Sequence, residues 1–177
     1  MPESGRPPSV ARVPEQRGPV LLRATTLKDL PFILTAEQDA DSRQFIIPWS
    51  AEQHATALGD SDIAHLVIEQ KGRESVGFVI VAGLTNAHAS LEFRRIVVSA
   101  KGKGIGRAAV RLVKQLAFAQ WHAHRLWLDV KQNNLRARRL YESEGFAVEG
   151  LIRECLRGES GYESLIVMSM LEKEHLR

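Results

Sequence analysis

Apolar and polar residues follow two different periods along this chain, and the changes of period predict an order of strands and helices. Segments that alternate or are continuously apolar predict strands over residues 20–23, 65–69, 76–82, 91–98, 126–130, 146–152 and 162–170. Apolar residues spaced by three and four predict helices over residues 27–36, 104–120 and 135–143. Ser50 and Gln53 have the spacing of a capping box, which predicts a short helix that ends near Leu58.

The order of these elements predicts a mixed α/β (α+β) fold. The strands on either side of Lys71-Gly72-Arg73 predict an antiparallel hairpin, and residues 91–130 predict one strand–helix–strand crossover. The 177 residues contain no internal repeat and no long linker, so we expect a single domain over residues 19–177. Four prolines within residues 1–18 predict a flexible N-terminal tail.

Composition narrows the class of protein. The formal net charge of +3 is mild, so we expect no nucleic-acid partner. No apolar stretch approaches the ~20 residues that cross a bilayer, so we expect no membrane span. The single cysteine, Cys155, excludes an internal disulfide, favours a reducing cytoplasmic compartment and is expected to be buried. The six histidines lack metal-ligand spacing, so no metal site is predicted.

The strongest candidate for chemistry is the segment Lys101-Gly102-Lys103-Gly104-Ile105-Gly106, which lies between a predicted strand and a predicted helix. The first backbone N–H groups of a helix have no partner within the helix, and its dipole places partial positive charge there. This arrangement binds phosphate groups, whereas a single glycine pair is more often only a tight turn. Three glycines and two lysines together favour a phosphorylated ligand.

Two nucleotide-binding motifs were compared with this segment. A P-loop is excluded, because no GxxxxGK followed by Ser or Thr is present. A dinucleotide fingerprint fits Gly104, Gly106 and Ala109, with Asp129 at the end of the next strand. Only one crossover unit is predicted, however, and no second nucleotide-binding half follows it. A nicotinamide- or flavin-dependent oxidoreductase is therefore the second interpretation.

A second motif follows the next predicted strand, and with the glycine segment it resembles the GCN5-related N-acetyltransferase superfamily. That motif consists of Asn134, Ala137, Leu140, Tyr141, Gly145 and Phe146. The chain departs from the family pattern at Lys101, where arginine or glutamine is usual. Phe45-Ile46-Ile47-Pro48-Trp49, followed by Glu52 and His54, also resembles the branch with ribosomal-protein and spermidine acetyltransferases.

The resemblance implies a central mixed sheet of about seven strands flanked by about four helices. It also implies direct acetyl transfer from acetyl-CoA to a primary amine, carried by a small molecule or a protein N-terminus. Splayed strands would admit acetyl-CoA between Arg95–Val98 and Trp127–Val130, and the amine would approach over residues 25–60. The resemblance is compatible with a homodimer, and a non-catalytic acyl-CoA sensor on the same fold stays an alternative.

The resemblance also implies residue roles. Tyr141 would be the general acid that protonates the leaving thiolate, although its place in an apolar helix stripe also fits a core tyrosine. Glu92 is expected on the same strand face as Arg94 and Ile96, either as a base acting through water or as an arginine-paired carboxylate. Acetyl-CoA is expected to contact Ile96, Val97, Val98, Lys101, Gly102, Lys103, Gly104, Ile105, Gly106, Arg107 and Asn134.

Several of these residues, and others near them, allow two interpretations. Asn134 could contact the cofactor, cap the following helix, or do both with different atoms. Trp49 could line the acceptor pocket or pack in the core. Glu37, Asp39 and Asp41 could attract a cationic amine or be ordinary surface acids.

Overall fold

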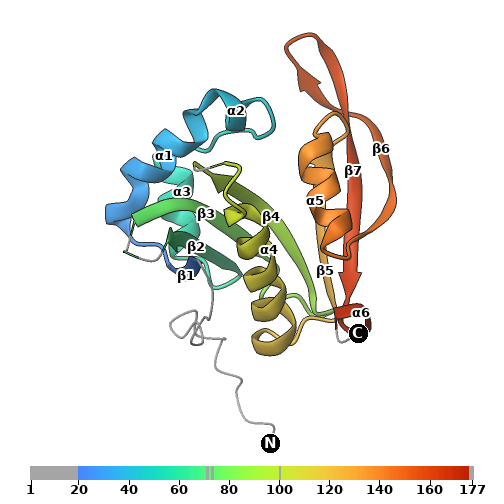
Figure 1. Cartoon of the computed structure of the whole chain (residues 1–177), viewed down its shortest axis with the longest axis horizontal. Coiled ribbons are helices and arrows are strands. Elements are labelled where there is room, and N and C mark those ends of the chain that lie inside the picture. Colours follow the sequence, from blue (N-terminus) through green and yellow to red (C-terminus); the bar gives the residue numbers. More distant parts are fainter. Residues whose placement is uncertain (1–19, 71, 73, 100, 176–177) are drawn as a thin grey trace, which may run out of the picture.

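A computed structural model describes residues 20–70, 72, 74–99 and 101–175, so the predicted tail and two residues of the predicted hairpin turn, Lys71 and Arg73, lie outside the described residues. Seven strands form one twisted sheet in the order β1-β2-β3-β4-β5-β7-β6 (Figure 1). Only β4 and β5 among them pair in parallel, and the other neighbours are antiparallel. Their bounds are β1 Val20–Ala24, β2 Ile63–Gln70, β3 Glu74–Ala82, β4 Ser90–Val98, β5 Arg125–Lys131, β6 Ala147–Gly158 and β7 Gly161–Leu171. The mixed sheet predicted from the sequence is confirmed.

The predicted helices are also present. They are η1 Leu27–Asp29 continuing into α1 Leu30–Gln38, α3 Ala51–Leu58, α4 Ile105–Gln115 continuing into the π-helical turn η2 Leu116–Gln120, and α5 Leu135–Ser143. The capping box at α3 is formed, with the Ser50 hydroxyl accepting from the Gln53 N–H at 3.2 Å. The four-residue helices α2 Ala40–Arg43 and α6 Glu172–His175 were not predicted, because one turn shows no helical period.

The two faces of the sheet are covered by different helices, as Figure 1 shows. On one face, α4, η2 and α5 pack over a large apolar core that includes Leu66, Val79 and Phe93. On the other face, α1 packs against Phe78, Ile80 and Val97 in a smaller cluster. Alternate residues of β3 therefore enter two different cores, which explains why this strand is almost continuously apolar.

A β-bulge interrupts β4. Ile80 pairs with Arg95 and Ala82 pairs with Glu92, so three steps on β4 oppose two steps on β3. Phe93 before the bulge and Ile96 after it consequently both pack against the larger core, although three positions separate them. The prediction that Glu92 shares a face with Ile96 is therefore wrong, because the bulge reverses the alternation between them.

The edge strand β6 differs from its prediction in length and exposure. It runs to Gly158, six residues beyond the predicted end, and it pairs only with β7. Cys155 lies on this strand and is exposed, so the expectation that it is buried is wrong. An edge strand lacks a neighbour on one side, and ten of the twelve residues of β6 are exposed.

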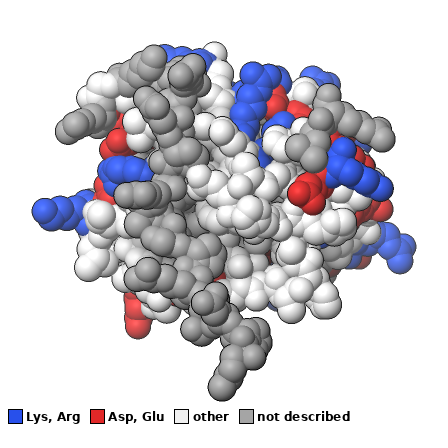
Figure 2. All heavy atoms as spheres, turned by 90° about the horizontal axis from the view of Figure 1, so that it is seen from below, with Lys and Arg blue, Asp and Glu red and all other residues white. Residues whose placement is uncertain are grey.

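The lengths of the helices and the distribution of surface charge relate to two partners considered from the sequence, a membrane and a nucleic acid. No helix among the described residues is both long and apolar enough to cross a membrane. On the face of the molecule in Figure 2, blue basic and red acidic side chains are interspersed around an uncharged centre. Charges of both signs therefore share this face.

One buried carboxylate joins α4 to the end of α5. The Glu144 side chain is only 3% exposed and contacts Arg107 at 2.7 Å, Arg111 at 3.0 Å and Lys114 at 3.2 Å. Lys114 also donates to the Glu144 backbone carbonyl at 2.7 Å. Burial alone would raise the pKa of Glu144, but the three cations hold it below its usual value.

Replacing Glu144 with glutamine should therefore destabilise the fold by about 1–3 kcal/mol at pH 7, because three cations lose their counter-charge. A carboxyl whose pKa is lowered by folding contributes stability above its unfolded pKa, and this contribution is lost as the pH falls. The difference between wild type and Glu144→Gln should shrink toward pH 3 in urea unfolding. Glu142→Gln, at an exposed pair with Arg138 on the same helix, is the control and should change little. Equal losses at pH 7 and pH 3 would contradict this account.

Candidate functional site

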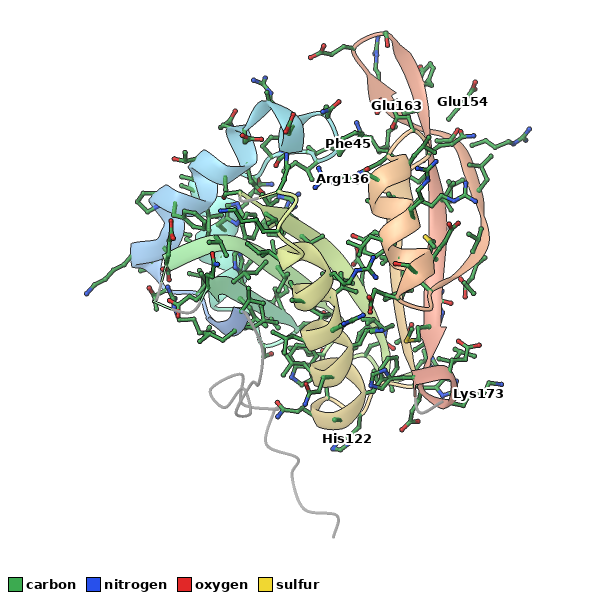
Figure 3. All side chains as sticks on the ribbon, viewed as in Figure 1. Phe45, His122, Arg136, Glu154, Glu163 and Lys173 are labelled. Atoms are coloured by element: carbon green, nitrogen blue, oxygen red, sulfur yellow. The ribbon has the colours of Figure 1, made fainter. Side chains whose placement is uncertain are left out.

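A cleft opens where β4 and β5 separate. The two parallel strands pair only from Ser90–Arg125 to Glu92–Trp127, although both continue for several residues beyond that point. The resulting cleft has a volume of about 1190 Å³ and is lined by β4, β5, α5, the start of α4 and the segment after α2. Phe45 and Arg136, labelled in Figure 3, line it from the segment after α2 and from α5. The predicted splay between Arg95–Val98 and Trp127–Val130 is confirmed.

The glycine segment, at the start of α4, forms one wall of the cleft. Gly102 and Gly104 have φ values of 82° and 74°, in the left-handed region that disfavours other residues. A Cβ atom at either position would meet nothing within 4 Å, so backbone conformation rather than space requires glycine there. The helix's first internal bond runs from the Ala108 N–H to the Gly104 carbonyl at 3.0 Å. The N–H groups of Ile105, Gly106 and Arg107 precede it and are available to an anion.

The basic residues near this helix start are not equivalent. The Lys101 ammonium lies 3.4 Å from Asp39 and 3.3 Å from Asp41, so its charge is already partnered by acids at α2. Arg107 is engaged by Glu144, and Lys103 does not line the cleft. Two arginines of α5, Arg136 and Arg139, are exposed, line the cleft and have no ion pair within the described chain. The unpaired positive charge beside the glycine segment therefore comes from α5.

Asn134 and the end of β4 complete this wall. The Asn134 side-chain oxygen accepts from the Ala137 N–H at 3.2 Å, so its predicted capping role is confirmed. Asn134 also lines the cleft, and its amide nitrogen has no partner among the described residues. Ile96, Val97 and Val98 line the same cleft on the part of β4 that has left β5. The unpaired side of this strand faces the gap between the two strands.

Tyr141 lies at the base of the cleft on α5. Its ring packs edge-to-face with Phe93 at 6.3 Å and with Phe146 at 5.8 Å between centroids. The residue is 7% exposed and lines the cleft, and its hydroxyl has no hydrogen-bond partner in the described part of the chain. Burial, with a contribution from the charge of Asp129, raises the pKa of the phenol above its usual value. Tyr141 is thus both a core residue and a protonated hydroxyl at the cleft.

Two carboxylates of β4 and β5, Glu92 and Asp129, line the cleft, and the sequence predicts a catalytic role only for Glu92. Glu92 is paired with Arg94 at 2.7 Å, as one interpretation of it proposed. Asp129 on β5 is two residues beyond the last pair with β4, lines the cleft and has no partner within the described residues. Desolvation by the surrounding protein, followed by the nearby charge of Glu92, raises the pKa of Asp129, although its side chain is exposed to the cleft. The sequence analysis includes Asp129 only as part of a dinucleotide fingerprint. The one signal for a place in the cleft is that Asp129 lies near the end of a predicted strand.

One end of the cleft is more apolar. The segment after α2 contributes Phe45, Ile46, Ile47 and Trp49, and the β6–β7 hairpin contributes Leu156 and Leu165. Lys131, at the end of β5, donates to the Gln44 carbonyl at 2.9 Å and pairs with Glu163 at 2.6 Å. This lysine therefore bridges the two walls at that end.

The acids near α1 are not all surface residues, as one interpretation of the sequence held. Glu37 is completely buried, while Asp39 and Asp41 contact Lys101. Trp49 both lines the cleft and packs against the smaller core. No group of three or more His, Cys, Asp or Glu residues in the described ranges is arranged to hold a metal ion.

Comparison with known proteins agrees with this geometry. Residues 30–146 match the family model described as "Acetyltransferase (GNAT) family". The chain is 27% identical over 163 residues to a spermidine N(1)-acetyltransferase of Vibrio cholerae, covering 88% of this chain and 94% of the relative. It is 26% identical over 166 residues to the Escherichia coli protein of the same name, covering 89% and 88%.

Solved structures show the same fold. A chimera of the spermidine N-acetyltransferase SpeG from Vibrio cholerae and hSSAT superposes with a TM-score of 0.83 at 25% identity, covering 90% of this chain and 99% of that one. The Vibrio cholerae enzyme in complex with CoA and spermine superposes with a TM-score of 0.82 at 24% identity, covering 90% and 99%. The mixed sheet has one parallel pair and no second nucleotide-binding half, unlike a dinucleotide-binding fold. The chain therefore belongs to the acetyltransferase (GNAT) family and is an N-acetyltransferase that uses acetyl-CoA as its acetyl donor.

Proposed function

We propose that this protein transfers the acetyl group directly to the primary amine of a small cationic acceptor in a ternary complex, with spermidine as the first candidate. The observation that carries the proposal is the cleft between β4 and β5, which is lined by the glycine-rich start of α4, by the nearly buried Tyr141 and by the carboxylate of Asp129, unpaired within the described residues. The names of the two bacterial relatives support spermidine as the acceptor.

The donor end is assigned to acetyl-CoA. The N–H groups of Ile105, Gly106 and Arg107 would hold the diphosphate, and Arg136 and Arg139 would supply unpaired positive charge for its phosphates. The open space above Gly102 and Gly104 fits a ligand that approaches the backbone closely. Backbone groups of Ile96–Val98 would pair with the amides of the donor, and the Asn134 amide nitrogen is free to join them.

Acetyl-CoA supplies a thioester, whose carbonyl carbon the neutral amine attacks; the new C–N bond replaces the C–S bond. A backbone N–H on the free part of β4, at Ile96 or Val97, would stabilise the negative charge on the carbonyl oxygen. Tyr141 would give its proton to the leaving thiolate. In water a phenol (pKa ~10) is a weaker acid than a thiol (pKa ~8.5), but the dry surroundings of Tyr141 also disfavour a thiolate.

The acceptor amine must lose a proton before it attacks, because an alkylammonium has a pKa of about 10.4. We assign the binding of the ammonium to Asp129 and Glu92 together. Asp129 would receive the proton directly or through water, since its charge is not engaged by a cation of the described chain. Glu92 already neutralises Arg94 and so contributes less.

The charges of the cleft favour a second acceptor class. Of the lining carboxylates in the described ranges, Asp41 and Glu92 are paired with basic side chains, and Asp129 alone is not. Lys131 also places a positive charge at the apolar end. One free carboxylate in a cleft that Phe45, Ile47 and other apolar side chains also line fits a monoamine with an apolar body.

An acceptor panel with measurement of released thiol tests the proposal. We expect acetyl-CoA at 100 times its Kd to raise the unfolding free energy by ~2.7 kcal/mol, NAD to have no effect, and thiol release to be faster with spermidine than with phenethylamine. Faster release with phenethylamine would favour the monoamine class. Stabilisation by acetyl-CoA without thiol release from any amine would indicate the acyl-CoA sensor instead of the enzyme.

Replacing Tyr141 with phenylalanine should lower kcat by ~100-fold or more, because the thiolate would lose its proton donor. The KM for acetyl-CoA should stay within about twofold, since the ring and its packing are kept. Tyr162→Phe removes the only other tyrosine hydroxyl, which is exposed on β7, and serves as the control. Unchanged turnover in Tyr141→Phe would remove the phenol from the mechanism.

Replacing Asp129 with asparagine should lower kcat/KM for the amine by ~10–100-fold, the value of one charge-assisted contact. Glu92→Gln is the matched comparison and should lose less, because Arg94 already engages that carboxylate. Steady-state kinetics with saturating acetyl-CoA measures both. A larger loss in Glu92→Gln would reverse the two assignments.

A further inference from the structure

The buried carboxylate of Glu37 joins three elements beneath the apolar end of the cleft. It lies on α1 and is 0% exposed, although glutamate is rarely fully buried. One oxygen accepts from Arg95 on β4. The other accepts from the Trp49 backbone N–H at 2.9 Å and lies 3.2 Å from the His54 ring nitrogen on α3, in a bent contact.

Arg95 extends this arrangement to the cleft wall. Its guanidinium donates to the Ile47 carbonyl at 2.7 Å and lies 4.8 Å from the centre of the Trp49 ring. Glu37 and Arg95 thus fix both ends of the Ile47–Trp49 segment, one through the Trp49 N–H and the other through the Ile47 carbonyl. Ile47, Trp49 and Arg95 all line the cleft.

Two histidines continue the arrangement away from the cleft. His54 contacts His65 at 3.0 Å, and His65 contacts the Thr25 hydroxyl at 2.9 Å. Burial, together with the adjacent His54, lowers the pKa of His65 to about 4, so His65 is neutral at pH 7. Which nitrogens donate in the His54–His65–Thr25 series depends on the tautomers of the two rings.

We propose that Glu37 is a positioning residue for acceptor recognition: with Arg95 it holds the Ile47–Trp49 segment against β4 and so sets the shape of the amine-binding end. The inference rests on the proposed use of this end of the cleft for the amine. A carboxylate is required because Arg95 and the Trp49 N–H are both donors, one to each oxygen. A glutamine would place its NH₂ against at least one of them.

Glu37→Gln should raise the KM for the amine by ~10-fold or more and leave the KM for acetyl-CoA within about twofold, because the donor end is built from other residues. Arg95→Lys is the second variant, because lysine keeps the charge but lacks the planar guanidinium that contacts two partners at once. It should likewise raise the KM for the amine and leave the KM for acetyl-CoA nearly unchanged. Asp62→Asn is the control: Asp62 also holds a loop through two backbone N–H groups, of Gly83 and Thr85, but it is not part of the cleft.

Hydrogen exchange gives a readout that does not depend on turnover. Amides of residues 44–50 should exchange faster in both variants, and amides of residues 102–108 should not change. If the wild type turns over no amine but this exchange pattern is seen, Glu37 and Arg95 do hold the Ile47–Trp49 segment, and it is the proposed function that fails. Equal changes in both KM values, or unchanged exchange over residues 44–50 in folded Glu37→Gln or Arg95→Lys, would overturn the inference.

Discussion

The separation of β4 from β5 after three paired residues is the constraint on which the rest of this structure depends. Parallel neighbours in a sheet normally continue to exchange backbone hydrogen bonds, and here they stop at Glu92 and Trp127. The free ends of both strands then have unsatisfied backbone groups that a ligand with amides can pair with. The bulge in β4 lies at this point and turns Ile96 toward the larger core and Arg95 toward Glu37.

Local patterns were sufficient to predict the glycine segment and the helix that carries Tyr141. The glycines at 102 and 104 adopt the left-handed conformation, and the motif from Asn134 to Phe146 forms the helix and turn that bring Tyr141 to the cleft. These features depend on residues close together in the chain, so periodicity and turn chemistry identify them. The seven strands follow for the same reason, because each has its own apolar pattern.

The apolar end of the cleft depends on contacts between residues far apart in the sequence. From the local sequence Glu37 is expected to be a surface acid. Its burial is possible because Arg95, 58 residues later in the chain, neutralises its charge. The bulge could not be anticipated either, because the local sequence of β4 alternates well enough to predict an uninterrupted strand. Asp129 and Cys155 show the same limit: their environments are set by where β4 diverges and by which strand lies at the edge of the sheet.

The bridge at Lys131 has a consequence for the motion of the two walls. At one end they are joined by backbone pairing in the interior of the sheet, which opens only when the sheet itself is disrupted. At the other end they are joined by one flexible lysine between a carbonyl and a carboxylate. Partly exposed side chains of this kind exchange rotamers within nanoseconds. The main chain thus fixes the width of the cleft where β4 and β5 pair, and side-chain rotation can adjust it at the outer end. Under the proposed function, acceptors of different girth could then share one rigid site of chemistry.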